Sequence, residues 1–140
     1  MIRTWRWIIL TLLMVAGSVQ ADIYVVVHRD SPLTRVTPEL IRDLYLARVQ
    51  SLPSGERLIP VDRADEALRA RFIESLIGMD VRRFDAYWAR LVFAGRVLPP
   101  VKVESEDQLS GTLSERPTAV GYTDRPPASA ELRTVLVIPG

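Results

Sequence analysis

The chain has 140 residues, with 18 basic and 17 acidic side chains and no cysteine. This balance, without any basic cluster interleaved with aromatic residues, argues against a nucleic-acid partner. The lack of cysteine excludes disulfides and a lipid-attachment thiol, and the length suffices for one domain with one hydrophobic core.

Residues 1–21 have the three parts of a secretory signal. Arg3 and Arg6 form a basic start, residues 7–16 are apolar, and a small residue precedes the expected cleavage point. The apolar run is shorter than the roughly 20 residues that span a bilayer, so cleavage is favoured over a retained anchor. We expect a signal peptide at 1–21 and one domain at 22–140, exported to a bacterial periplasm without a membrane anchor. Without Arg3 and Arg6, 16 of the 18 basic residues remain against 17 acidic ones, for a net charge of −1.

The first half of the mature chain predicts two strand and helix pairs. Residues 23–28 are rich in β-branched side chains, which is typical of a buried strand. A helix is expected after Thr37, which can cap it and is followed by proline. The second strand is expected at 58–61, followed by a helix over about 65–77 that Gly78 closes.

The second half continues the alternation of helices and strands. A helix is expected between Asp80 and Gly95, a short extended piece at 101–103 and another helix at about 105–114. Strands are expected at 119–123 and 132–138, so the whole pattern predicts an α/β domain with a mainly parallel or mixed sheet. The apolar stripe expected to be buried on the first of these helices is formed by Phe84, Trp88, Leu91 and Val92.

The segment 58–72 is the candidate anion site, because a strand there leads almost directly into a helix. A helix N-terminus has unpaired N–H groups and partial positive charge, and Arg63 is expected at the turn before it. Asp65 and Glu66, however, lie in the first turn, where carboxylates can cap the same donors and repel an anion. The segment therefore both predicts an anion site and argues against one.

Catalytic and metal-binding patterns are sparse. The single histidine, His28, would have to serve any zinc site or catalytic triad, and neither a nucleophile elbow nor a phosphate-binding glycine loop is present. Asp62, Asp65 and Glu66 fall where caps and solvated turns occur. We therefore expect no enzyme activity, no metal and no cofactor, and a hydrolase using Asp62 or His28 is the least favoured alternative.

Six short stretches of the mature chain occur in a characteristic order, at residues 44–48, 58–72, 87–88, 93–95, 99–100 and 119–122. In content and order this set resembles the substrate-binding proteins of phosphate ABC importers. The closer resemblance is to short, signal-bearing relatives in which one periplasmic-binding-protein-like domain stands alone. This resemblance covers most of the mature chain and implies a single type 2 periplasmic-binding-protein-like lobe, with a mixed sheet flanked by helices.

The resemblance also implies where a ligand would bind. In the phosphate binders the equivalent junction reads Arg-Ser-Asp-Gly-Ser-Gly-Thr, in which the arginine, the second serine and the threonine hold the dianion. This chain reads Arg-Ala-Asp-Glu-Ala-Leu-Arg from Arg63, so Arg63 and Asp65 match the pattern. Ala67, Leu68 and Arg69 replace Ser-Gly-Thr, which removes two hydroxyl donors, although a guanidinium can return cationic character. The implied oxyanion site is therefore Arg63, Ala67, Leu68 and Arg69, with Ser31 or Thr123 expected to contribute from neighbouring strand ends.

The function implied is that of a periplasmic solute-binding-type protein that binds phosphate or another small oxyanion weakly around Arg63. One lobe leaves such a site open to solvent, which weakens each contact. An ABC transporter permease or another periplasmic protein would be the partner. The alternative is a degenerate binding fold that acts as a protein-interaction or sensor-accessory module without a small-molecule ligand.

Overall fold

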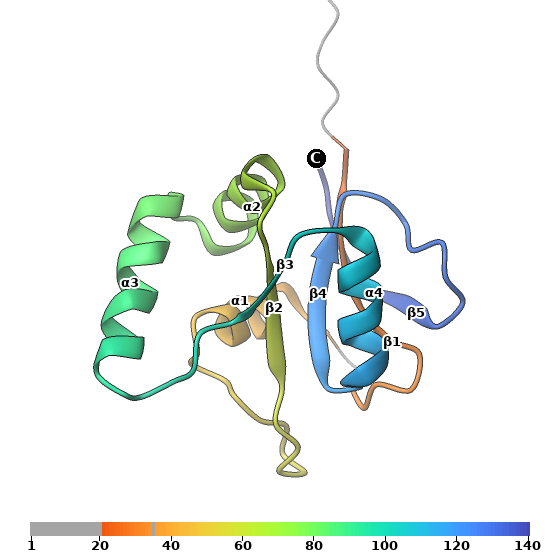
Figure 1. Ribbon diagram of the computed structural model, residues 1–140, viewed down its shortest axis with the longest axis horizontal. Helices are drawn as coiled ribbons and strands as arrows, with labels where there is room; N and C mark the ends of the chain where they lie inside the picture. The colour runs from red at the N-terminus through yellow and green to blue at the C-terminus, as the bar shows by residue number, and fades with distance from the viewer. Residues whose placement is uncertain (1–20, 35) are drawn as a thin grey trace, which may run out of the picture.

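The computed structural model describes residues 21–34 and 36–140, so nearly all of the expected signal peptide lies outside the described residues. Within these ranges no helix is both long and apolar enough to cross a membrane. Figure 1 shows the arrangement of the elements. The strands are β1 (Ile23–His28), β2 (Ile59–Arg63), β3 (Val101–Val103), β4 (Ala119–Thr123) and β5 (Leu132–Ile138). The helices are α1 (Pro38–Tyr45), α2 (Glu66–Phe72), the π-helical turn η1 (Ile73–Ile77), α3 (Val81–Phe93) and α4 (Glu106–Glu115).

The strands form one mixed sheet in the order β3-β2-β4-β1-β5. Strands β3, β2 and β4 are mutually parallel, whereas β1 is antiparallel to both of its neighbours. The carboxyl ends of β2, β3 and β4 therefore meet at one edge of the sheet. The predicted α/β domain with a mixed sheet flanked by helices is confirmed.

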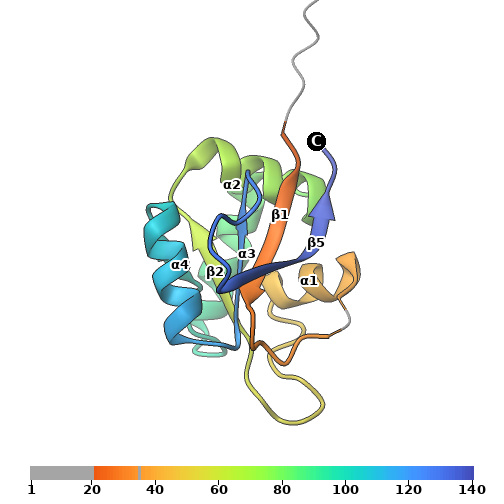
Figure 2. The same ribbon diagram turned by 90° about the vertical axis from the view of Figure 1, so that its right-hand side faces the viewer.

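Helices cover both faces of the sheet. Successive residues of a strand point to opposite faces and so belong to two different cores. Val25, Val120 and Tyr122 belong to the core under α1, α2 and α3. Val26 and Ala119 belong to the smaller core under α4. In Figures 1 and 2, α4 accordingly lies on the side of the sheet away from α2 and α3.

An aromatic cluster fills the larger core, on the face of the sheet that α1, α2 and α3 cover. Phe72 stacks on Tyr122 with ring centroids 3.8 Å apart, and Tyr45 meets Phe72 edge-on at 4.8 Å. The hydroxyl of Tyr45 donates to the carbonyl of Val61 at 2.7 Å, and Trp88 Nε1 donates to the carbonyl of Tyr45 at 2.8 Å. These contacts hold α1, α2 and α3 against β2 and β4.

Three details differ from the sequence expectation. Strand β2 extends to Arg63 because Asp62 and Arg63 pair with β3, and a distant partner strand leaves no local signal. The expected continuous helix over 65–77 is α2 followed by η1, which ends at Gly78 with φ 78°. The stripe of α3 is only partly buried, because α3 lies at the outer side of its layer, where Val92 stays 37% exposed (Figure 1).

Candidate functional site at the carboxyl edge of the sheet

Three consecutive parallel strands bring polar residues to one edge. Arg63 ends β2, Thr123 ends β4, and Glu106 begins α4 shortly after β3. Ligands of open α/β sheets bind at this edge, outside the carboxyl ends of the strands. Ser31 follows β1, which runs antiparallel to β4. Ser31 therefore lies at the opposite edge of the sheet and does not join these residues.

Arg63 is buried and already paired with an anion of the chain itself. Its side chain is 5% exposed, its Nη1 donates to the carbonyl of Tyr122 at 3.1 Å, and its Nη2 donates to Glu106 Oε1 at 2.9 Å. The Thr123 hydroxyl lies 2.9 Å from both Glu106 oxygens and donates to this carboxylate. Arg63 Nε is buried without a hydrogen-bond partner in the described part of the chain. The expectation that Arg63 lies in a turn is therefore wrong.

A second ion-pair cluster lies on the other face of β2, because successive strand residues point to opposite faces. Asp62 Oδ2 accepts from Arg69 Nε at 2.7 Å, and Asp85 Oδ1 accepts from Arg69 Nη2 at 2.6 Å. Asp62 Oδ1 accepts from the Tyr122 hydroxyl at 2.7 Å and from the backbone N–H of Arg63 at 2.8 Å. Asp62 is only 5% exposed, so its expected place in a solvated turn is also wrong.

The electrostatics of this cluster keep Arg69 charged and Tyr122 neutral. Burial lowers the pKa of Arg69, but hydrogen bonds to Asp85 and Asp62 outweigh it, and the net shift of the pKa is upward. Burial, followed by the charge of Asp62, raises the pKa of Tyr122 well above its usual range. Tyr122 therefore remains a neutral donor to the Asp62 carboxylate.

An open hollow of about 660 Å³ lies beside α2 at this edge, and we call it the β2 hollow. Of the four predicted site residues, Arg63, Ala67 and Arg69 line it. Leu68 is 3% exposed and belongs to the core, so the structure does not bring its side chain to the hollow. The charged residues of the lining are Arg63, Arg69 and Lys102, with Glu66 and Asp85.

The N-terminus of α2 is capped by its own sequence, as the acidic first turn predicted. Asp65 Oδ1 accepts from the backbone N–H of Leu68 at 3.2 Å, and the N–H of Ala64 donates to the carbonyl of Val103 at 2.9 Å. The side chain of Asp65 thus accepts from a helix N-terminal N–H group that could otherwise bind an anion.

Sequence reasoning named Thr123 but missed the two carboxylates and the phenol hydroxyl that complete the site. Glu106, Asp85 and Tyr122 come from three different elements, and only their spatial arrangement links them to Arg63 and Arg69. One signal was available for Glu106, since it starts a helix directly after a predicted strand whose end shares the edge with Arg63.

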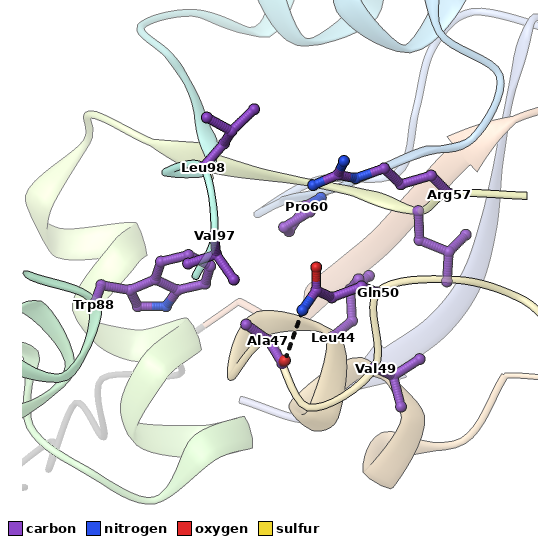
Figure 3. Close-up of a pocket in the computed structure, with 10 residues that line it drawn as sticks. Leu44, Ala47, Val49, Gln50, Arg57, Pro60, Trp88, Val97 and Leu98 are labelled. Atoms are coloured by element: carbon purple, nitrogen blue, oxygen red, sulfur yellow. Dashed lines mark hydrogen bonds between the residues drawn. The ribbon is translucent and has the colours of Figure 1, made fainter. Parts of the chain in front are cut away.

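The remaining features of the described residues offer less chemistry. Figure 3 shows a pocket near the start of β2, lined mainly by apolar groups such as Leu44, Trp88 and Val97, whose volume of about 40 Å³ suits little more than water. His28 Nδ1 accepts from the backbone N–H of Asp30 at 3.1 Å, a local structural bond. In residues 21–34 and 36–140, no cluster of three or more histidine or acidic residues could hold a metal.

Comparison with solved structures shows where this fold occurs. An ABC-type phosphate transport receptor from Vibrio cholerae matches with a TM-score of 0.61 at 18% identity, over 84% of this chain and 47% of that one. A putative phosphate ABC transporter substrate-binding protein with bound phosphate from Clostridium perfringens matches with a TM-score of 0.64 at 15% identity, over 84% and 46%. PstS from Borrelia burgdorferi matches with a TM-score of 0.55 at 13% identity, over 76% and 42%.

The chain thus spans about half the length of the solved structures it matches. No family model matches the chain, and no curated protein matches it in sequence. The expected periplasmic-binding-protein fold is confirmed by these structures. At such low identity the likeness concerns the fold alone.

Proposed function

We propose that this chain is a periplasmic protein of the solute-binding type that binds phosphate or a similar small oxyanion weakly in the β2 hollow. The observation that carries the proposal is the state of Arg63 and Arg69. Both line the hollow, and both already donate to carboxylates of the chain. The fold shared with phosphate-transport proteins supports the choice of ligand class.

The charges of the hollow explain why binding is weak. Arg63, Arg69 and Lys102 are opposed by Glu66 and Asp85 in the lining itself. Asp62 and Glu106 add two further negative charges in direct contact with the arginines. An incoming oxyanion therefore meets three positive charges that are opposed by four negative ones, and an open site lets water and salt screen its contacts with the cations. We expect a dissociation constant on the order of 1 mM, which corresponds to about −4 kcal/mol.

The partner proposed is an ABC transporter permease or another periplasmic protein, and the proposed role is non-enzymatic. The solved structures that share the fold are about twice as long, so this chain presents roughly one half of such a structure. We propose that a partner covers the open hollow when tighter capture is needed, since excluding water strengthens hydrogen bonds to a bound anion.

An NMR titration of the purified protein with inorganic phosphate tests this function. We expect saturable amide shifts at residues 63–70 and at Lys102, which is exposed in the hollow. Lys102→Ala should weaken binding about two- to fivefold, as loss of an exposed charge contact does. Arg96→Ala removes an exposed charge outside the hollow and is the matched control. Absence of saturable shifts up to about 50 mM phosphate would contradict the proposal, since that is far above the expected constant.

A second candidate function, a protein-interaction module without a small ligand, is favoured by two large exposed apolar side chains. Phe93 is 96% exposed and Leu98 is 74% exposed, at the end of α3 and in the loop that follows. Single exposed apolar side chains are common, but these two lie five positions apart in the sequence and both face solvent, which favours a contact surface. A photo-crosslinking amino acid in place of Phe93 should then capture a specific protein in the periplasm, whereas the same probe in place of Glu115 should not. Equal labelling at both positions would count against this candidate.

A further inference from the structure

We infer that the Glu106 carboxylate is an internal occupant of an oxyanion site formed by Arg63 and Thr123, and that small oxyanions bind there once this carboxylate is removed. The inference goes beyond the proposed function, because it names a second oxyanion site that the wild-type chain keeps filled with its own carboxylate. This site lies on the α4 face of the sheet, whereas Arg69 and Asp62 lie on the α2 face.

The contacts of Glu106 are those that an oxyanion would make. One carboxylate accepts 2.9 Å hydrogen bonds from a guanidinium and from a hydroxyl, on Arg63 and Thr123. Charged and hydroxyl donors of this kind bind phosphate, sulfate and carboxylates alike. The donors come from the carboxyl ends of two parallel strands, the usual ligand position of an open α/β sheet.

The two donors, Arg63 and Thr123, are buried, whereas the acceptor, Glu106, is partly exposed. Arg63 is 5% exposed as a side chain and Thr123 is 2% exposed, whereas the Glu106 side chain is 39% exposed. The two donors are therefore fixed in the fold, and the acceptor reaches them from the surface at the first residue of α4. Removal of the acceptor would leave the donors in place.

Arg63 retains an unused donor, which is a second sign of a receptor. Its Nε is buried and has no hydrogen-bond partner in the described part of the chain, although buried N–H groups are normally paired. The Tyr122 carbonyl meanwhile holds Nη1 at 3.1 Å and fixes the guanidinium. A small oxyanion with several acceptor oxygens can pair with more of this guanidinium than one carboxylate does.

Space for an anion is present next to Glu106. A pocket of about 320 Å³ is lined by Glu106 and Thr123, together with Ser110, Arg125 and Ser129. This volume exceeds that of a phosphate ion, and the lining is separate from that of the β2 hollow. A solute can therefore reach the carboxylate position from the α4 side.

A purely structural ion pair is the competing explanation for the same contacts. Both explanations expect Glu106→Ala to lower the melting temperature, because it leaves the charge of Arg63 buried and unpaired. Only the internal-occupant explanation expects phosphate to restore that loss, since a ligand that binds the folded state alone raises its stability. Rescue by an anion therefore separates the two.

The test compares Glu106→Ala with Asp107→Ala by phosphate titration calorimetry and by thermal melts. Asp107 is exposed in the same first turn of α4 and lines the same pocket, but in the described residues it makes no ion pair and accepts no hydrogen bond from Arg63 or Thr123. Its removal therefore changes the charge of the pocket without freeing the two donors, which makes it a control for charge alone. We expect Glu106→Ala to bind phosphate at least about tenfold more tightly than wild type, and Asp107→Ala to stay within about twofold. Phosphate should also raise the melting temperature of Glu106→Ala more than sodium chloride at equal ionic strength.

Two further variants keep the test decisive. Thr123→Val in the Glu106→Ala background removes the hydroxyl at nearly constant volume and should reduce the gain in affinity. Glu106→Gln keeps the side-chain size and must still bind phosphate more tightly than wild type, should Glu106→Ala fail to fold. Equal affinities for the Glu106 variants and Asp107→Ala would overturn the inference. Failure of wild type to bind phosphate, with a gain in the variants, would overturn the proposed function alone.

Discussion

At the scale of single residues, Asp62 connects the two arginines of the candidate site. Its carboxylate accepts from Arg69, from the Tyr122 hydroxyl and from the backbone N–H of Arg63. These three groups are buried or nearly so, so none of them can turn to water if the carboxylate is lost.

We expect Asp62→Ala to lower the free energy of unfolding by about 3–5 kcal/mol, because it leaves Arg69 Nε and the buried Tyr122 hydroxyl without their acceptor and Arg69 with Asp85 alone. Urea denaturation measures this change. Asp43→Ala is the control, since its pair with Arg48 spans 3.8 Å at a largely exposed position and should cost less than about 1 kcal/mol. Similar losses in the two variants would show that Asp62 does not hold the cluster together.

The two buried tyrosines predict how stability depends on alkaline pH. Burial and the charge of Asp62 raise the pKa of Tyr45 and of Tyr122 above the ordinary value near 10. Below that pH both states keep the phenol protons, so these groups cause no pH dependence. Above it the unfolded chain loses protons that the folded chain retains, and stability falls by about 1.4 kcal/mol per pH unit for each tyrosine. Urea denaturation between pH 9 and 11 should show a shallower decline for Tyr122→Phe, and an unchanged slope would contradict the assignment.

Local sequence patterns predicted residues well where the cause was local. Thr37, Asp65 and Asp80 accept from backbone N–H groups at the starts of their helices, as capping residues do. The roles of Asp62 and Glu106 depend on partners 60 and 43 positions away, on Tyr122 and Arg63. No periodicity or spacing in the sequence encodes such pairs. The charge balance of the site could therefore be worked out only from the structure.

At the scale of elements, the position of α4 depends on a glycine in β4. A Cβ atom built on Gly121 would lie 2.4 Å from Leu109 Cδ1. Leu109 is 1% exposed, so its side chain has little room to move. The missing side chain of Gly121 therefore allows α4 to pack closely and to bring Glu106 to the edge of the sheet.

We expect Gly121→Ala to cost about 1–3 kcal/mol of unfolding free energy, the usual effect of overpacking a core. Gly111→Ala within α4 is the control, and we expect it to raise the unfolding free energy. A Cβ atom there meets nothing within 4 Å, and alanine favours a helix over glycine by about 0.5–1 kcal/mol. Thermal denaturation of both variants measures the difference. A stabilised Gly121→Ala would show that α4 is not held at its closest approach.

The order of elements was largely predictable, but their ends and mutual placement were not. Strand β3 at 101–103, β4 at 119–123 and β5 at 132–138 have the predicted bounds. Strand β2 continues to Arg63 because β3 pairs with it, and α2 changes into η1 without a visible sequence signal. These differences moved Asp62 and Arg63 from an expected turn into the buried end of a strand.

At the scale of the whole molecule, one lobe carries the site and leaves it open. The solved structures with this fold are about twice as long, and the β2 hollow of about 660 Å³ is much larger than a single phosphate. The hollow is open to solvent, and the two arginines that line it already have anionic partners. Openness and internal neutralisation therefore act in the same direction, and both would weaken the anion binding that we propose.

Isothermal titration of the wild-type protein with inorganic phosphate at low ionic strength tests this account most directly. If Arg63 and Arg69 are held by Glu106, Asp62 and Asp85, phosphate should bind with a dissociation constant on the order of 1 mM, and added salt should weaken it further. A dissociation constant of about 1 μM or below would mean about 4 kcal/mol of additional binding energy, and so would contradict the claim that these arginines are already occupied.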